Sequence, residues 1–313
     1  MDLFDKKGIR PMLISELKEP FDSPDYIFEL KLDGIRCIAY LDPEKNSSEL
    51  INKRDFKLLP RFPELNEIHK QVKKKCILDG ELIVSKNGVP DFFEIQRRSM
   101  MSDPFKIRLA DKQHPASFVA YDIIYIDGEL TTDLDLIKRK KLLEKIVKEN
   151  DRIAISRYIE NNGIKLFELA KQQKLEGIVA KLKGSKYLFD KRSKDWIKIK
   201  FLEDKDFVVC GYILKENNMA SLVIAQYGND GILVYKGHVT LGVSLRKLEQ
   251  YNYKIASSPS IPHVPEGNEN AVWLEPTLVA IVEYMPNDKG ALRQPVLKGI
   301  REDKLPIECR EEQ

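Results

Sequence analysis

The sequence predicts an α+β protein with two domains, a larger N-terminal one of strands and helices and a smaller C-terminal β-barrel. Three observations support this. The 313 residues are long for a single hydrophobic core. Strand-like alternation and helical periodicity both occur before residue 202, whereas short strand-like runs with turn signals dominate after it. We therefore place the domains at residues 1–201 and 202–313.

The first domain is expected to alternate strands with helices. Its first 26 residues, which are rich in proline, are expected to be irregular, and a helix is expected to open at Phe62–Pro63. The helix at 135–148 is amphipathic, with its lysines on a solvated face. The other expected elements are strands flanking residues 31–34 and at 76–84, 117–126, 177–182 and 196–202, and helices at 92–99 and 165–174.

The second domain shows shorter apolar runs separated by turn signals. The expected strands are 207–214, 221–227, 232–240 and 278–285, with turns at 228–231 and 287–290 and a short helix at 245–251. About five strands in a segment of this length are typical of a small barrel of the oligonucleotide-binding (OB) kind.

Composition excludes several classes of protein. At 42% hydrophobic and 32% charged residues the chain reads as soluble, and a net charge of only +3 means that a polyanion would have to be bound by local clusters of charge. Its four cysteines stand far apart, which favours buried free thiols over disulfides or a zinc site. The charged N-terminus and the lack of a long apolar run predict a cytoplasmic protein that is not bound to a membrane.

Residues 29–36 combine groups that suit a nucleotide site built on a lysine. Lys31 supplies an amine, Asp33 a carboxylate, Gly34 allows close approach of backbone, and Arg36 suits phosphate or ribose oxygens. Read alone, the segment could equally be a charged hairpin in which Asp33–Gly34 is only a turn.

The pattern Lys-x-Asp-Gly-x-Arg resembles the nucleotidyl-attachment motif of the covalent nucleotidyltransferases, which include polynucleotide ligases and messenger-RNA capping enzymes. Segments that resemble the later motifs of this family follow in the expected order. They are residues 79–81, 118–123, 176–181, 196–200 and 301–304.

This resemblance implies a role for each matching residue. Lys31 would attack ATP and carry AMP, with the nearby Asp33 counted among the catalytic residues, and Tyr121 would stack on adenine. Glu81 would touch the ribose or a metal, and Glu176 would serve Mg²⁺ or Mn²⁺. Asp303 and Lys304, beside Arg301, would orient the pyrophosphate. The remaining expected nucleotide contacts are Glu29, Arg36 and Arg54, of which Arg54 fits least well because Asp55–Phe56 replaces the usual small turn.

Lys198 and Lys200 have a physical role that can be argued directly. Two residues apart on a strand, they share one face and could neutralise an α-phosphate in the transition state. As neighbouring cations they would also favour the neutral amine that Lys31 needs for attack. The alternative is a pair of lysines on the solvent face of an edge strand.

The resemblance covers the whole chain and is closest to ATP-dependent DNA ligases, in particular the ligase domain of bacterial end-joining ligases, because of residues 292–299. It implies an adenylation domain of antiparallel sheets flanked by helices, followed by an OB-fold. It also implies nicked or broken duplex DNA as substrate, a monomer, and an end-binding protein and a repair polymerase as partners. Eight Lys or Arg against two Asp in residues 181–200 suggest a grip on DNA phosphates.

Two alternatives stay open at this point. A capping guanylyltransferase or an RNA ligase would share the same motifs and would differ from a DNA ligase in its nucleotide or its acceptor. A non-catalytic nucleic-acid-binding module with an OB barrel would not need Lys31, Glu176, Lys198 and Lys200 to be intact.

Overall fold

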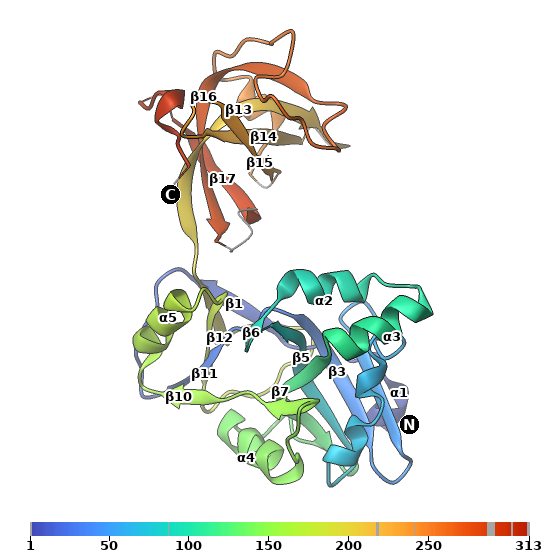
Figure 1. The fold of residues 1–313 in the computed structure, drawn as a ribbon. Helices are drawn as coiled ribbons and strands as arrows, with labels where there is room; N and C mark the ends of the chain where they lie inside the picture. The colour runs from blue at the N-terminus through green and yellow to red at the C-terminus, as the bar shows by residue number, and fades with distance from the viewer. Residues whose placement is uncertain are drawn as a thin grey trace. The chain divides into compact units, whose positions relative to one another are not determined.

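The computed structural model describes residues 2–86, 88–216, 219–240, 242–286, 292–301 and 303–311. The chain forms two compact units, Met1–Lys200 and Phe201–Gln313. Figure 1 shows the elements of each unit.

Two sheets form the first unit. The first has the order β1-β12-β11-β2-β10, and the second has the order β4-β3-β5-β7-β8, with β6 paired to β5 and β9 to β7. The strands of the first sheet are β1 (Leu13–Leu17), β2 (Tyr26–Leu30), β10 (Tyr158–Glu160), β11 (Gly177–Leu182) and β12 (Arg192–Lys200). Those of the second are β3 (Ile35–Asp42), β4 (Ser47–Asn52), β5 (Cys76–Lys86), β6 (Val89–Pro90), β7 (Ala116–Ile126), β8 (Glu129–Leu130) and β9 (Ile153–Ile155).

Strand pairing in these sheets is antiparallel, as expected, except for two parallel pairs, β1 with β12 and β7 with β9. The first parallel pair corrects the expectation of an irregular N-terminus. β1 is held there because Leu13 N donates to Lys191 O at 2.9 Å and Met12 N donates to the hydroxyl of Tyr187 at 3.2 Å. The connection between β11 and β12 therefore fastens the N-terminal segment to the sheet.

The described residues of this unit form the helices α1 (Leu3–Lys6), α2 (Phe92–Ser99), α3 (Pro104–Gln113), α4 (Leu136–Ile146) and α5 (Gly163–Gln172). The helix expected from Phe62–Pro63 is instead two short 3₁₀ turns, Pro63–Leu65 and Ile68–Gln71. α3 was not expected, because its apolar periodicity is weak. It begins through local chemistry, since Asp103 accepts hydrogen bonds from the N–H groups of Phe105 and Lys106, and Pro104 takes the first position.

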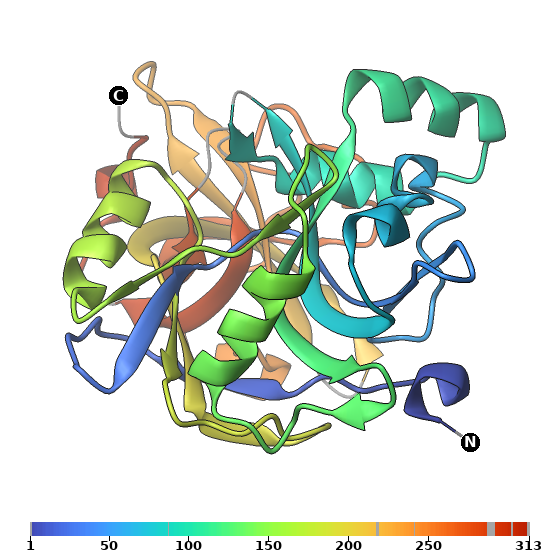
Figure 2. The same ribbon diagram turned by 90° about the horizontal axis from the view of Figure 1, so that it is seen from below.

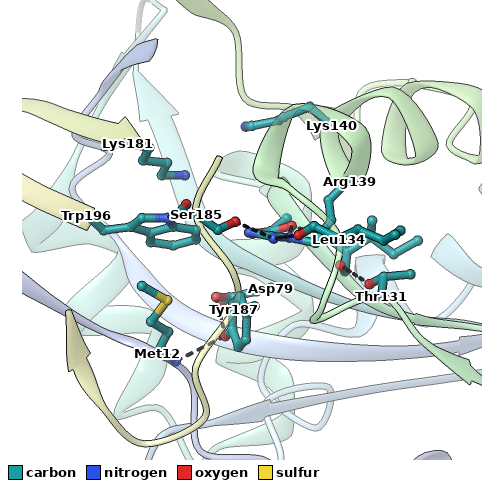
Figure 3. Close-up of polar contacts among 12 residues, drawn as sticks. Met12, Asp79, Thr131, Leu134, Arg139, Lys140, Lys181, Ser185, Tyr187 and Trp196 are labelled. Atoms are coloured by element: carbon teal, nitrogen blue, oxygen red, sulfur yellow. Dashed lines mark hydrogen bonds and ion pairs between the residues drawn. The ribbon is translucent and has the colours of Figure 1, made fainter. Parts of the chain in front are cut away.

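The solvated lysine face predicted for α4 is wrong at Lys140, and the neighbouring Arg139 is buried as well. Arg139 is fully buried and forms a bidentate pair with Asp122 at 2.8 and 2.9 Å, and Lys140 is buried in an ion pair with Glu29. Figure 3 shows Arg139 reaching the carbonyl oxygens of Ser185 and Leu134. α4 packs on β7, as Figure 2 shows, and its cations neutralise acids beneath it.

The second unit is a five-stranded antiparallel sheet with the order β15-β14-β13-β16-β17 and the short helix α6 (Leu245–Leu248). Its strands are β13 (Glu203–Leu214), β14 (Ala220–Tyr227), β15 (Leu233–Val239), β16 (Val272–Met285) and β17 (Arg293–Arg301). β16 is longer than expected, and β17 was not assigned as a strand from the sequence. The predicted turn at 287–290 lies outside the described residues.

All four cysteines are free and buried, as predicted. None of the helices within the described ranges is long and apolar enough to span a membrane.

Candidate active site

Lys31 lies in the connection between β2 and β3, where its backbone N–H donates to Gly177 O at 2.9 Å. Gly34, in the same connection, is needed for packing: a Cβ there would lie 2.2 Å from Leu82 O on β5. Gly34 therefore lets β5 approach the loop closely. From the sequence, this glycine was instead expected to let the backbone approach a ligand. Gly177 is constrained as well, with φ of +138° and a Cβ position 2.1 Å from Ile199 O.

A cavity of about 190 Å³ opens beside Lys31. It is lined by both sheets and contains an aromatic side chain, Tyr121, and an aliphatic one, Val179, as a base would require. Of the residues predicted for nucleotide binding, Glu29, Lys31, Arg36, Glu81 and Tyr121 line it. Val179 was not predicted, although its place between Glu176 and Lys181 on a strand puts it on the same face as Lys181.

Lys31 forms a close ion pair with Glu176. Its Nζ lies 2.5 Å from Glu176 Oε2, and the two side chains are only 19% and 4% exposed. Glu176, which the sequence assigned only to a metal, is thus also the ion-pair partner of Lys31.

Lys198 and Lys200 lie beside this pair on β12, opposite Val179 and Gly177 of β11. Burial and the charge of Lys198 lower the pKa of Lys200. Lys198 Nζ pairs with Glu16 Oε2 at 2.8 Å. Burial tends to raise the pKa of Glu16, but the hydrogen bond from Lys198 and the nearby lysines hold it below its ordinary value. Glu16 was missed because β1 was missed.

Glu81 and Arg36 form the side of the cavity on the second sheet. Burial raises the pKa of Glu81 to about 8, against the opposing charges of Lys31 and Arg36. The Arg36 guanidinium holds Asp79 in a bidentate pair at 3.1 and 2.6 Å, and the Tyr187 hydroxyl donates to Asp79 at 2.7 Å. Figure 3 shows Tyr187 next to Asp79, with a dashed line from the Met12 N–H to the Tyr187 hydroxyl.

Glu29, one of the residues that line the cavity, lies in a buried cluster. One carboxylate oxygen pairs with Lys140, and the other accepts from Lys181 at 3.0 Å and from the Ser156 hydroxyl at 2.8 Å. Burial tends to raise the pKa of Glu29, but the two lysines bring it below its ordinary value. The ammonium of Lys181 also lies 4.5 Å from the centre of the Tyr121 ring.

Other predicted site residues lie apart from the cavity. Arg54 is exposed, and neither Arg54 nor Asp33 belongs to the cavity lining. Within the described ranges, no three His, Cys, Asp or Glu side chains are grouped as a metal site would require. Glu81 and Glu176 could therefore hold a cation only together with other ligands, such as phosphate oxygens or water, which is how Mg²⁺ is commonly bound.

The basic segment 181–200 is a poorer DNA-binding surface than its composition suggested. Most of its cations are already engaged: Lys181 with Glu29, Lys183 with Glu160, Lys186 with Asp135, Lys198 with Glu16, and Arg192 with Ile14 O. Tyr187 and Trp196 are buried. This segment supports the fold and the cavity more than it offers charge to a ligand.

In the second unit, the predicted residues gather around Asp206 of β13. Asp206 Oδ2 accepts from Arg301 Nη1 at 2.9 Å and from Lys304 Nζ at 2.7 Å. Arg301 also forms a bidentate pair with Asp303 at 2.9 and 2.6 Å. The Arg301 hydrogen bond lowers the pKa of Asp303 to about 2. The role of Asp206 was not predicted, since nothing in the sequence marks it as a partner of residues almost a hundred positions later.

Comparison with known proteins identifies the family. Residues 11–200 match the ATP dependent DNA ligase domain, and residues 215–304 match the ATP dependent DNA ligase C terminal region. The first match alone covers more than half of the chain, so this chain belongs to the ATP-dependent DNA ligase family. The match favours the ligase interpretation over the capping and binding-module alternatives.

Two curated relatives place the chain within that family. The SPbeta prophage-derived DNA ligase-like protein LigB of Bacillus subtilis is 28% identical over 94% of this chain and 99% of its own length. The multifunctional non-homologous end joining protein LigD of Pseudomonas aeruginosa is 29% identical over 95% of this chain but only 36% of its own length. This chain is therefore similar to a minor part of LigD.

Solved structures confirm the predicted fold, an adenylation domain followed by an OB-fold. Mycobacterial DNA ligase D complexed with ATP and MES has a TM-score of 0.57 at 24% identity, covering 97% of this chain and 99% of that one. A Lig E DNA ligase has a TM-score of 0.59 at 16% identity, covering 92% and 98%.

Proposed function

We propose that this chain joins a 5′-phosphate to a neighbouring 3′-hydroxyl in DNA through AMP bound covalently to Lys31. The observation that carries the proposal is the place of Lys31. Its amine lies at a cavity with an aromatic wall at Tyr121, next to Glu176 and to the strand that bears Lys198 and Lys200.

These residues divide the first step among them. The Lys31 amine forms a bond to the α-phosphorus of ATP while pyrophosphate leaves, and Glu176 at 2.5 Å is placed to take the ammonium proton. Lys198 and Lys200 neutralise charge on the α-phosphate. Asp303 and Lys304, with Arg301, orient the departing pyrophosphate. AMP then moves to the 5′-phosphate of the break, and the 3′-hydroxyl displaces it.

The nucleotide and metal contacts follow from the cavity. Tyr121 and Val179 would hold adenine between them, and Glu29 would accept from its amino group. Arg36 and Glu81 would contact the ribose, while Arg54 and Asp33 are left to contacts outside the cavity. Glu81 and Glu176 are the carboxylates that would hold Mg²⁺ or Mn²⁺ with phosphate oxygens, where the ion would supply further charge neutralisation.

The test is to incubate the protein and magnesium with α-labelled ATP or, separately, α-labelled GTP, and to look for label that survives denaturation. Stable label from ATP alone, absent in Lys31→Ala and discharged by nicked duplex DNA, is the expected result. Label from GTP would indicate a capping-type enzyme. Absence of label from both, in protein shown by mass to carry no AMP, would leave a binding module.

The LigD relatives suggest a role in end joining, with a separate end-binding protein and a repair polymerase as partners and a cytoplasmic, nucleoid-associated monomer as the active form. Nick sealing and end joining are distinguished by comparing rates on nicked, cohesive-ended and blunt-ended duplexes. Acceleration of blunt-end joining by an added end-binding protein would support the role in end joining. Sealing of nicks alone would argue against it.

A further inference from the structure

Helix α3 presents an outward face that the site described above does not use. Two of its exposed residues are large and apolar: Phe105 is 68% exposed and Leu109 is 45% exposed. Met100, just before the helix, is 70% exposed. Figures 1 and 2 show α2 and α3 at one edge of the first unit. This face needs an explanation because neighbouring exposed apolar side chains on a soluble protein commonly mark a binding surface.

Cations flank the apolar pair on both sides. Successive helical residues turn by about 100°, so Phe105 and Leu109 lie about 40° apart, with Arg108 and Lys112 on one side and Lys106 on the other. All three cations are exposed, and among the described residues none of them has an ion-pair partner. We call Phe105, Lys106, Arg108, Leu109 and Lys112 the α3 face.

The acids of the helix lie at its start, where the exposed Asp103 also interacts electrostatically with Lys106 and Arg108, and on its inner side. Asp103 accepts from the N–H groups of Phe105 and Lys106 as the helix cap, and Asp111 is half-buried on the opposite side. The inward positions, Ile107 and Ala110, are buried. The outward face is thus positive and apolar with no acid within it, which is the chemistry that suits a polyanion with apolar grooves.

We propose that the α3 face binds the duplex DNA substrate, with its three cations on backbone phosphates and Phe105 and Leu109 against the sugars of a groove. The inference rests on the proposed ligase function. The same structure shows why another surface is needed: the cations of residues 181–200 are mostly paired within the protein, whereas those of the α3 face are available.

The test compares two triple variants of the full chain. Lys106→Ala/Arg108→Ala/Lys112→Ala removes the cations of the α3 face. The control, Lys138→Ala/Lys141→Ala/Lys145→Ala, removes three exposed lysines from α4 and so removes the same charge from the same unit. Among the described residues of α4, no large apolar side chain is exposed. Binding of a fluorescent nicked duplex is measured by anisotropy between 50 and 300 mM salt.

The α3 variant is expected to bind the duplex about tenfold more weakly than the parent. The slope of log affinity against log salt should become shallower by about 0.9 for each phosphate that the protein no longer neutralises. The α4 variant should resemble the parent in both. Phe105→Ala should weaken binding without changing the slope, because it removes no charge. If the α3 and α4 variants bound DNA equally well, the proposal would be overturned. The α3 face would then be explained by a protein partner.

The outcome is separable from that of the proposed function. All variants should take up label from α-labelled ATP at the rate of the parent, because the α3 face is not part of the cavity. If the parent takes up no label, the ligase proposal fails, and the anisotropy series still decides whether α3 binds duplex DNA. If labelling is normal and the α3 variant binds DNA like the parent, only the present inference fails.

Discussion

The two units each carry a cluster of charged side chains proposed to act on the same triphosphate, but the clusters are built differently. In the first unit Lys31 and Glu176 are 19% and 4% exposed, and Glu29 is enclosed by Lys140 and Lys181. In the second unit Arg301 is 32% exposed and Asp303 is 70% exposed. Buried charges interact more strongly and are less affected by salt than exposed ones.

The difference indicates a division of labour. The buried cluster fixes the atoms that react, because each of its charged groups is surrounded by partners that hold it. The exposed cluster is held by two carboxylates, those of Asp206 and Asp303, and Asp303 is itself exposed, so the cluster can exchange protein partners for phosphate oxygens at low cost. Substitutions in the first unit should therefore cost more activity than those in the second.

The largest effect is expected for Lys31→Arg. This substitution keeps a positive charge for Glu176 but removes the nucleophile, since a guanidinium stays protonated in proteins. Labelling by α-labelled ATP should fall below detection while the thermal unfolding midpoint stays close to that of the parent. Measurable labelling in Lys31→Arg would show that another residue carries AMP.

A smaller loss is expected for Lys200→Ala. Removing one charge that stabilises the transition state should slow self-adenylylation by about 100-fold. Lys194→Ala is the matched control, because Lys194 lies on the same strand but is exposed, whereas Lys200 is half-buried and its charge interacts with those of Lys31 and Glu176. Single-turnover labelling compares the two, and equal rates would refute a role for Lys200 at the phosphate.

A loss of about tenfold is expected when the exposed cluster is disturbed by Asp206→Asn, which leaves Arg301 and Lys304 without their shared anion. Asp303→Ala should have a similar effect. Both should slow self-adenylylation, increasingly at high salt, yet spare sealing by enzyme already carrying AMP. Equal loss in both steps would remove the proposed distinction between the two clusters.

The same comparison explains how far the sequence could lead. Residues that act through their own chemistry in a fixed order, such as Lys31, Tyr121 and Glu176, were found and lie together at or beside the cavity. Residues that act through a partner distant in sequence were not: Glu16 and Lys140 are each defined by one ion pair, and Asp206 is defined by two. The helical pattern alone predicts that Lys140 faces solvent, because Glu29, the acid packed beneath it, lies on a distant strand.

Apolar periodicity predicted some elements correctly and missed one that depends on local chemistry. α2 matches its expected bounds, and β11 does as well, because their apolar positions repeat clearly. α3 depends on Asp103 as its cap and on Pro104, and its outward apolar residues blur the pattern that a buried helix face would give. The helix that the pattern missed is thus the one whose exposed face is proposed to bind DNA.

The smallest effect concerns the free energy of unfolding. It tests whether a charged Lys181 in the buried cluster destabilises the fold. Burial lowers the pKa of Lys181 to about 8, despite the opposing charge of Glu29. Between pH 8 and 10.5 the unfolded chain would bind a proton that the folded lysine has released, so the free energy of unfolding should rise with pH across that range. The contribution is at most about 3 kcal/mol.

Lys181→Met isolates this contribution, because Glu29 keeps Lys140 as its partner and every other titrating group is shared with the parent. At pH 7 the variant should be at least as stable as the parent, since the buried ammonium is only partly compensated. This advantage should shrink as the pH rises from 8 to 10.5. The difference in unfolding free energy is measured by urea unfolding, followed by the fluorescence of the buried Trp196. Trp273 is replaced by Phe in both proteins so that Trp196 alone reports. A difference in unfolding free energy that does not change with pH would mean that Lys181 keeps its proton, and that the buried cluster is better compensated than its surroundings indicate.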